Sequence, residues 1–183
     1  GGPDILRALV DYPVIQQHVA AVVSLAGSIG GSPLAYDASQ WQLELLAEWP
    51  DADCDAGDGK SLASLTPHQR RSWLAENPLP ESIPYFSVVA LPEKERISSG
   101  LQGTWRDLAF IDPRNDSQVI FYDQVIPGST LLAYLNADHW AVAVPIARSH
   151  DIIGSTLIDE NDYPREAMFE ALLRYVEEAL ASP

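Results

Sequence analysis

The chain is poor in cysteine, in basic side chains and in long apolar runs. Its 183 residues include a single cysteine, which excludes an internal disulfide. Lysine and arginine number 11 against 26 acidic residues. The resulting net charge of −15 disfavours binding to nucleic acid and to anionic lipid headgroups. No apolar run reaches the ~18 residues of a membrane span. The expected class is therefore one acidic globular domain.

The cysteine content and the N-terminal residues bear on location. The lone Cys54 favours a reducing, cytoplasmic compartment. The chain begins at Gly1 without methionine, and no basic segment followed by an apolar one marks a signal peptide. A secreted location stays open if a signal peptide lies upstream of Gly1, so the location is left unassigned.

Short apolar runs alternate with helical patterns along the chain. Buried strands are predicted at 19–25, 83–91 and 129–135. Helices are predicted at 4–18 with a break at Pro13, 38–49, 66–77 with Thr66 as cap, 98–110 and 162–183, with a polar loop at 50–65. This alternation indicates an α/β fold with a parallel sheet. Three strands are few for such a sheet, so residues 1–183 are expected to form a single domain that is incomplete at its N-terminus.

Asp116 and His139 are the candidate catalytic acid and base. Each borders an apolar run that is typical of a strand, and His139 directly follows the third predicted strand. Loops at the carboxyl ends of parallel strands meet at one crevice, so the two side chains are expected to approach each other there. In a hydrolytic triad, the acid orients the histidine that takes the proton of the nucleophile. Alternatively, His139 is a core histidine beside Trp140 and Asp116 is a turn residue.

Asp123 is an alternative acid. It also follows an apolar run, Val119–Tyr122, and it is closer to His139 in the sequence. Sequence order alone leaves both carboxylates open.

Three segments resemble bacterial serine lipases and esterases of the α/β-hydrolase superfamily. Asn115-Asp116-Ser117-Gln118-Val119 is similar to the family's Asn-Asp-Gly-x-Val acid loop, with Ser117 in place of glycine. Asp138-His139 is similar to the family's base, and Gly31-Ser32-Pro33-Leu34-Ala35 to a turn after one of its strands. The resemblance implies the C-terminal part of an α/β-hydrolase, with a mostly parallel sheet and flanking helices. It also implies a carboxylic-ester substrate, either a small molecule or a lipid, and no metal or organic cofactor.

The nucleophile is the missing component. The family carries a serine in Gly-x-Ser-x-Gly on a strand-to-helix turn, and this chain has no such motif. The resemblance implies that the serine precedes Gly1, and that the N-terminal part of the same hydrolase is a partner of this chain. Ser28, in Ala26-Gly27-Ser28-Ile29-Gly30, is the internal alternative. The alternative function is a hydrolase-like binding or structural module without turnover.

Residues 37–82 are expected to contain two tryptophan-bearing helices. In the resembled family, insertions in this region often form a cap or lid, whereas aromatic helix faces are also typical of a core. The acidic run at 51–58 is interpreted as a solvated loop, because its twelfth position is Leu62 and not the glutamate of a calcium loop. The histidines have no ligand-like spacing, so no metal site is expected.

Overall fold

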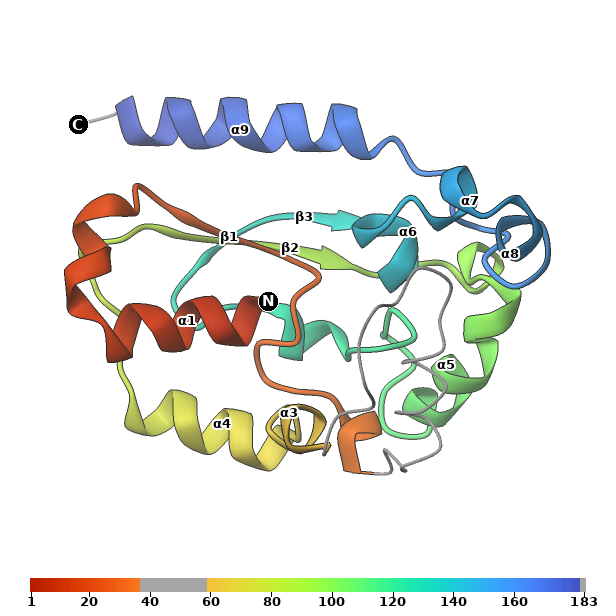
Figure 1. Cartoon of the computed structure of the whole chain (residues 1–183), viewed down its shortest axis with the longest axis horizontal. Coiled ribbons are helices and arrows are strands. Elements are labelled where there is room, and N and C mark those ends of the chain that lie inside the picture. Colours follow the sequence, from red (N-terminus) through yellow and green to blue (C-terminus); the bar gives the residue numbers. More distant parts are fainter. Residues whose placement is uncertain (37–58, 182–183) are drawn as a thin grey trace.

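Three parallel strands form the centre of the molecule, and the predicted α/β class is confirmed. The computed structural model describes residues 1–36 and 59–181 (Figure 1). Within these ranges, β1 (Val22–Leu25), β2 (Tyr85–Ala90) and β3 (Thr130–Leu135) lie inside the three predicted strands. The order is β1-β2-β3, so β2 is central and is buried along most of its length.

Helices cover the two faces of this sheet. In Figure 1, α9 lies on one side of the sheet, and α1 and α4 lie on the other. The α-helices are α1 (Gly2–Asp11), α3 (Lys60–Ala63), α4 (Pro67–Glu76), α5 (Gln102–Ala109), α6 (His139–Ala143), α7 (Ile146–Ser149), α8 (Asp151–Thr156) and α9 (Arg165–Ala181). The 3₁₀ helices are η1 (Pro13–His18), η2 (Pro33–Tyr36), η3 (Lys94–Arg96), η4 (Ser99–Leu101) and η5 (Phe121–Gln124).

Each face of the sheet has its own apolar core, because side chains alternate between the faces of a strand. On the α9 side, Val88 and Ala90 of β2 belong to one buried cluster with residues of α6, and partly buried Leu172 of α9 packs against this cluster. On the α1 side, buried Leu6 and Leu9 pack with Val22, and α4 adds partly buried side chains. The sheet is therefore packed on both faces, and this fixes the position of the loops at the carboxyl ends of the strands.

Several local predictions are refined by the structure. Pro13 does end the first α-helix, because the proline ring cannot continue the helix and the chain turns into η1. The segment predicted as a loop at 50–65 contains the short helix α3 in its described part. Thr66 does occupy the cap position of α4, but its hydroxyl donates to the Ala63 carbonyl at 3.0 Å and makes no cap bond.

The apolar run after Asp116 is not a strand, which corrects the prediction. Ile120 makes one isolated bridge to Asn115, and the chain then turns into η5. The physical reason is local: the Asp116 side chain binds the N–H groups of Gln118 and Val119, which removes them from any strand ladder.

No helix in the described ranges is long and apolar enough to cross a membrane. The predicted helix 38–49 and the whole acidic run 51–58, with Cys54, lie outside the described residues.

Candidate active site

The Asp116 carboxylate is fixed by the backbone of its own loop. Its Oδ1 accepts hydrogen bonds from the N–H groups of Gln118 at 2.9 Å and Val119 at 2.7 Å. The Asp116 N–H donates to the Val119 carbonyl at 3.1 Å, and the residue is completely buried. The loop thus uses one carboxylate oxygen for structure and leaves Oδ2 for another partner.

That partner is His139, the first residue of α6. Its Nδ1 lies 2.7 Å from Asp116 Oδ2, and its backbone N–H donates to the Asp116 carbonyl at 2.9 Å. Because a carboxylate only accepts, Nδ1 carries the proton and Nε2 has the free lone pair when the ring is neutral. Nε2 has no hydrogen-bond partner among the described residues, and the side chain is 25% exposed. The imidazole is therefore oriented to accept a proton at Nε2.

Two opposing effects act on the pKa of His139. Burial lowers it, whereas the charge of Asp116, the hydrogen bond to Asp116 and the charge of Asp138 raise it, and the net direction is upward. The pair thus stabilises the imidazolium that forms when the ring takes a proton, which is what a general base in a triad requires.

Asn115 holds the acid loop from the other side. Its amide nitrogen donates to the carbonyls of Asp112 at 3.1 Å and Trp105 at 3.3 Å, and its Oδ1 accepts from the Ser117 N–H at 3.0 Å. The Asn-Asp dipeptide of the sequence motif is therefore two buried side chains that bind backbone and together fix the loop.

Ser117, which stands where the resembled family has glycine, is strained. Its φ is 80°, a backbone conformation that residues other than glycine rarely adopt. Its buried hydroxyl has no hydrogen-bond partner. We expect Ser117→Gly to raise the free energy of unfolding by about 1 kcal/mol. The strain and the unpaired hydroxyl each cost about 1–3 kcal/mol, and the added flexibility of the unfolded chain offsets part of that gain.

Denaturant unfolding of the two proteins measures the difference. Ser87→Gly is the matched control, because Ser87 is also fully buried but its hydroxyl accepts from the Ile126 N–H at 3.0 Å. This control is expected to destabilise. A Ser117→Gly protein with a lower unfolding midpoint than the parent would contradict the assignment of strain.

The Gly-Ser-Pro-Leu-Ala turn supports the acid loop directly. The Ser32 hydroxyl donates to the carbonyl of Gln118, two residues after Asp116, and the Ser32 N–H donates to the Leu65 carbonyl at 2.8 Å. Two of the three segments that carry the sequence resemblance are thus in contact.

Asp123, the alternative acid, is bonded elsewhere. Both of its carboxylate oxygens accept from Arg71 Nη2 of α4 at 2.9 Å, and no hydrogen bond in the described part of the chain joins it to His139. Burial raises the pKa of Asp123, and Arg71 only partly opposes that rise. The structure therefore brings Asp116, and not Asp123, to the imidazole.

Ser28, the internal candidate for the nucleophile, lies in the loop after β1 and is partly buried. Its carbonyl accepts from the Gly31 N–H at 3.2 Å, but its hydroxyl makes no hydrogen bond to His139. Within residues 1–36 and 59–181, no serine, threonine or cysteine side chain is hydrogen-bonded to the His139 ring.

Gln124 is a residue of the site that sequence reasoning missed. It is completely buried, and its amide pairs with the backbone of Ala90: Oε1 accepts from the N–H at 2.7 Å, and Nε2 donates to the carbonyl at 3.0 Å. Nε2 also lies 3.3 Å from the Val119 carbonyl. The side chain therefore joins the end of β2 to the acid loop. A glutamine next to Asp123 carries no sequence signal of such a role.

The described part of the predicted cap region packs on the core. Arg70 Nε of α4 donates to the Ile29 carbonyl at 3.1 Å, Arg71 binds Asp123, and Trp73 packs against the α1-side core. Residues 37–58, with Trp41 and Trp49, lie outside the described residues. A cap over 37–82 thus stays a prediction.

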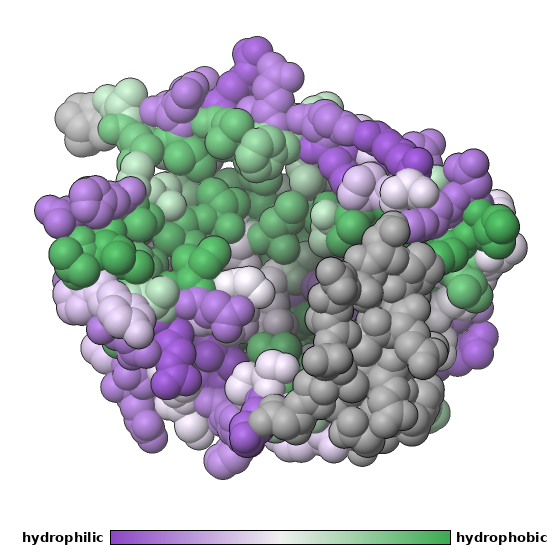
Figure 2. Space-filling view, in the orientation of Figure 1, coloured by the Kyte–Doolittle hydropathy of each residue, from purple (hydrophilic) through white to green (hydrophobic). Residues whose placement is uncertain are grey.

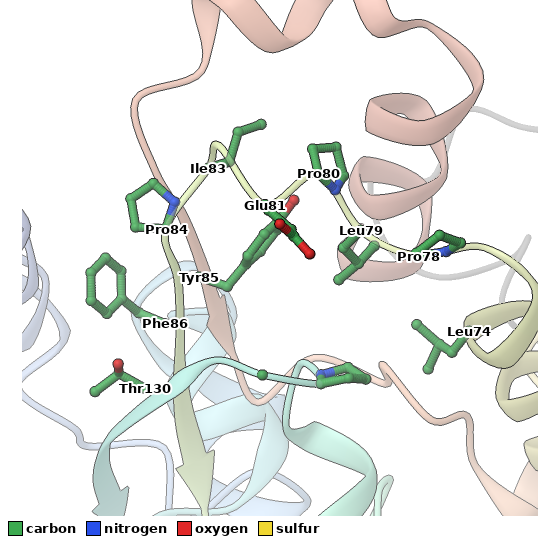
Figure 3. Close-up of a pocket in the computed structure, with 12 residues that line it drawn as sticks. Leu74, Pro78, Leu79, Pro80, Glu81, Ile83, Pro84, Tyr85, Phe86 and Thr130 are labelled. Carbon is green, nitrogen blue, oxygen red and sulfur yellow. The ribbon is translucent and has the colours of Figure 1, made fainter.

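A cavity of about 480 Å³ lies away from the Asp116–His139 pair. It is at the amino ends of β2 and β3, between Tyr85, Thr130 and the proline-rich segment 78–84 (Figure 3). The Asp116–His139 pair lies at the opposite, carboxyl ends of these strands. Among the described residues, no group of three or more His, Cys, Asp or Glu side chains is placed to hold a metal ion.

Solved structures of known proteins match this fold. The metagenomic carboxyl esterase MGS0156 is 44% identical with a TM-score of 0.88, and the match covers 98% of this chain and 54% of that protein. The mature form of Bacillus licheniformis lipase BlEst2 is 23% identical with a TM-score of 0.58, covering 76% of this chain and 55% of the lipase. Staphylococcus hyicus lipase is 12% identical with a TM-score of 0.56, covering 93% of this chain and 64% of the lipase.

No protein-family model and no curated protein sequence matches the chain. The chain spans about half the length of the first two solved proteins.

Proposed function

We propose a serine-hydrolase function for this chain, which belongs by fold to the α/β-hydrolases and matches part of a carboxyl esterase and of two lipases. The chain supplies the acid and the base that cleave a carboxylic ester through an acyl-enzyme. The single observation that carries the proposal is the 2.7 Å contact of His139 Nδ1 with Asp116 Oδ2, which leaves Nε2 without a partner among the described residues.

Each residue then has a defined role. His139 Nε2 takes the proton from a serine hydroxyl as that oxygen attacks the ester carbonyl, and returns it to the departing alcohol. Water repeats the sequence on the acyl-enzyme and releases the acid. Asp116 holds the ring in the required tautomer and stabilises the imidazolium. This chemistry needs no metal or organic cofactor.

The nucleophilic serine is proposed to precede Gly1, in the N-terminal part of the same hydrolase. Two features support a partner of that kind. The strand β1 has a free edge in the described sheet. α9 has no buried residue and exposes Phe169, Leu173 and Leu180. Figure 2 shows a broad apolar surface between α9 and the elements below it, of the kind that usually marks an interaction site.

A module without turnover is the second candidate. It is favoured by the lack of any serine hydroxyl on the His139 ring in the described residues. In that case the Asp116–His139 pair would fix the loops of a binding surface.

The experiment is covalent labelling of the whole gene product with a fluorophosphonate, followed by peptide mass spectrometry. We expect one adduct, on a serine upstream of Gly1 within Gly-x-Ser-x-Gly, together with hydrolysis of short-chain p-nitrophenyl esters. An adduct on Ser28 would move the nucleophile into this chain. A protein that neither labels nor hydrolyses these esters supports the module without turnover and contradicts the hydrolase.

A further inference from the structure

A second buried carboxylate, Asp138, lies directly before His139 and is not part of the acid–base pair. It is the N-cap residue of α6, and its Oδ1 accepts from the Ala141 N–H at 2.8 Å. A capping carboxylate at this place fixes the first turn of the helix, and His139 is the first residue of that turn. The position of the imidazole thus depends on a bond made by its neighbour.

The other oxygen of Asp138 binds a different segment of the chain. Oδ2 accepts from the Ser98 N–H at 2.9 Å, and both residues are completely buried. Ser98 lies after β2 and just before η4, whereas Asp138 lies after β3. The Ser98 hydroxyl in turn accepts from the Glu160 N–H at 3.3 Å. The Asp138 carboxylate therefore joins the loops that follow two neighbouring strands, and the Ser98 hydroxyl extends this connection to the segment after α8.

The backbone of His139 is held on both sides as a result. Asp116 accepts from its N–H and from its ring, and Asp138 fixes the helix turn that begins with it. Both carboxylates also act on the imidazole electrostatically. Burial lowers the pKa of His139, and the charges of Asp116 and then Asp138 oppose this effect. The charge of Asp138 also acts on Arg165, the first residue of α9. Burial lowers the pKa of Arg165, and the charge of Asp138 opposes that shift.

We propose that Asp138 is a positioning residue for the base. It holds His139 at the carboxyl edge of the sheet through two backbone hydrogen bonds, and it places a second negative charge beside the ring. This inference rests on the proposed function, since it assigns the positioning of the same base. Within the described part of the chain, the hydrogen bonds of the Asp138 carboxylate go to backbone N–H groups alone, so its role is to position His139 and not to take part in the chemical step.

The test is Asp138→Asn in the whole gene product, with Asp159→Asn as the matched control. Asp159 accepts from the Ser99 N–H at 2.7 Å and from the Ser99 hydroxyl at 2.6 Å, so it binds the neighbouring residue of the same loop. It is exposed and is not adjacent to the histidine. For Asp138→Asn we expect kcat per labelled active site to fall about 10- to 100-fold with KM close to the parent value. Asp159→Asn should leave both parameters near those of the parent.

A second readout needs no turnover. The NMR titration midpoint of the His139 ring, assigned by comparison with His139→Gln, should move to lower pH in Asp138→Asn and stay in place in Asp159→Asn. Asp138→Ser, which keeps a capping oxygen but no charge, should give the same displacement if the asparagine variant does not fold. An unchanged midpoint in a folded Asp138 variant would overturn the inference. An inactive parent protein contradicts the proposed function, and the titration then still decides whether Asp138 acts on His139.

Discussion

Asp116→Asn is expected to lower kcat about 10⁴-fold while the protein stays folded, because an amide cannot hold the reactive tautomer of His139. The asparagine side chain has nearly the same shape, so its oxygen can still accept from the N–H groups of the loop. What is lost is the negative charge 2.7 Å from His139 Nδ1. Steady-state ester hydrolysis, normalised to the number of fluorophosphonate-reactive sites, measures the effect.

The same variant should change the pH dependence. Activity requires the neutral imidazole, so kcat/KM rises as the pH passes upward through the pKa of His139. That pKa is raised in the parent: burial lowers it, but the charge and hydrogen bond of Asp116 and the charge of Asp138 together more than offset the effect of burial. Removal of the Asp116 charge should therefore move the acidic limb of the residual activity to lower pH.

Asp123→Asn is the matched control, since Asp123 is the other buried acid that sequence order favours. Its carboxylate binds Arg71, whose side chain is 55% exposed, and burial already raises its pKa. Neutralising it should leave kcat close to the parent value and change stability by less than about 2 kcal/mol. If Asp123→Asn lost activity as severely as Asp116→Asn, the assignment of the acid would be wrong.

The strands, and the approach of Asp116 to His139, could be predicted from the sequence, whereas the catalytic roles of the two residues stay a proposal. Short apolar runs give the strands, and in a parallel fold the residues that follow them must meet at one edge. His139 begins α6, which directly follows β3, and Asp116 lies in the connection that follows β2, after α5. Chain order could not separate Asp116 from Asp123, because the choice depends on the position of Arg71. Arg71 belongs to α4, which packs on the α1 side of the sheet. No sequence pattern near Asp123 indicates that this arginine will bind it.

The supporting contacts could not be predicted for a related reason. Gln124 completes the hydrogen bonding of Ala90, and Asp138 binds the Ser98 N–H, in each case across a long separation in sequence. A polar side chain in a loop gives the same signal whether it is solvated or buried against distant backbone. The strand prediction for the run after Asp116 was wrong for a local reason. The composition of the run is typical of a strand, but the Asp116 carboxylate binds the N–H groups that a strand would use.

Gly31→Ala is expected to lower the free energy of unfolding by about 3 kcal/mol, and to reduce activity in the molecules that still fold. Gly31 has a φ of +91°, where a side chain costs about 1–2 kcal/mol. A Cβ at this position would also lie 2.5 Å from the Leu65 carbonyl oxygen and 2.9 Å from Pro67 N. These are backbone atoms at the start of α4 that cannot rotate away, so overpacking adds about 1–3 kcal/mol.

We expect Gly31→Ala to lose activity because the next residue, Ser32, supports the loop that holds Asp116. Relief of the contact with Leu65 must move the turn, and Ser32 then loses its bond to the Gln118 carbonyl in the acid loop. Gly103→Ala is the control, because a Cβ there meets nothing within 4 Å. It lies inside α5, where alanine should stabilise by about 0.5–1 kcal/mol. Denaturant unfolding and kcat of both variants decide the matter. A Gly31→Ala protein as stable as Gly103→Ala would mean that the turn relaxes without cost, and that the glycine of the motif does not serve to bring Ser32 to the acid loop.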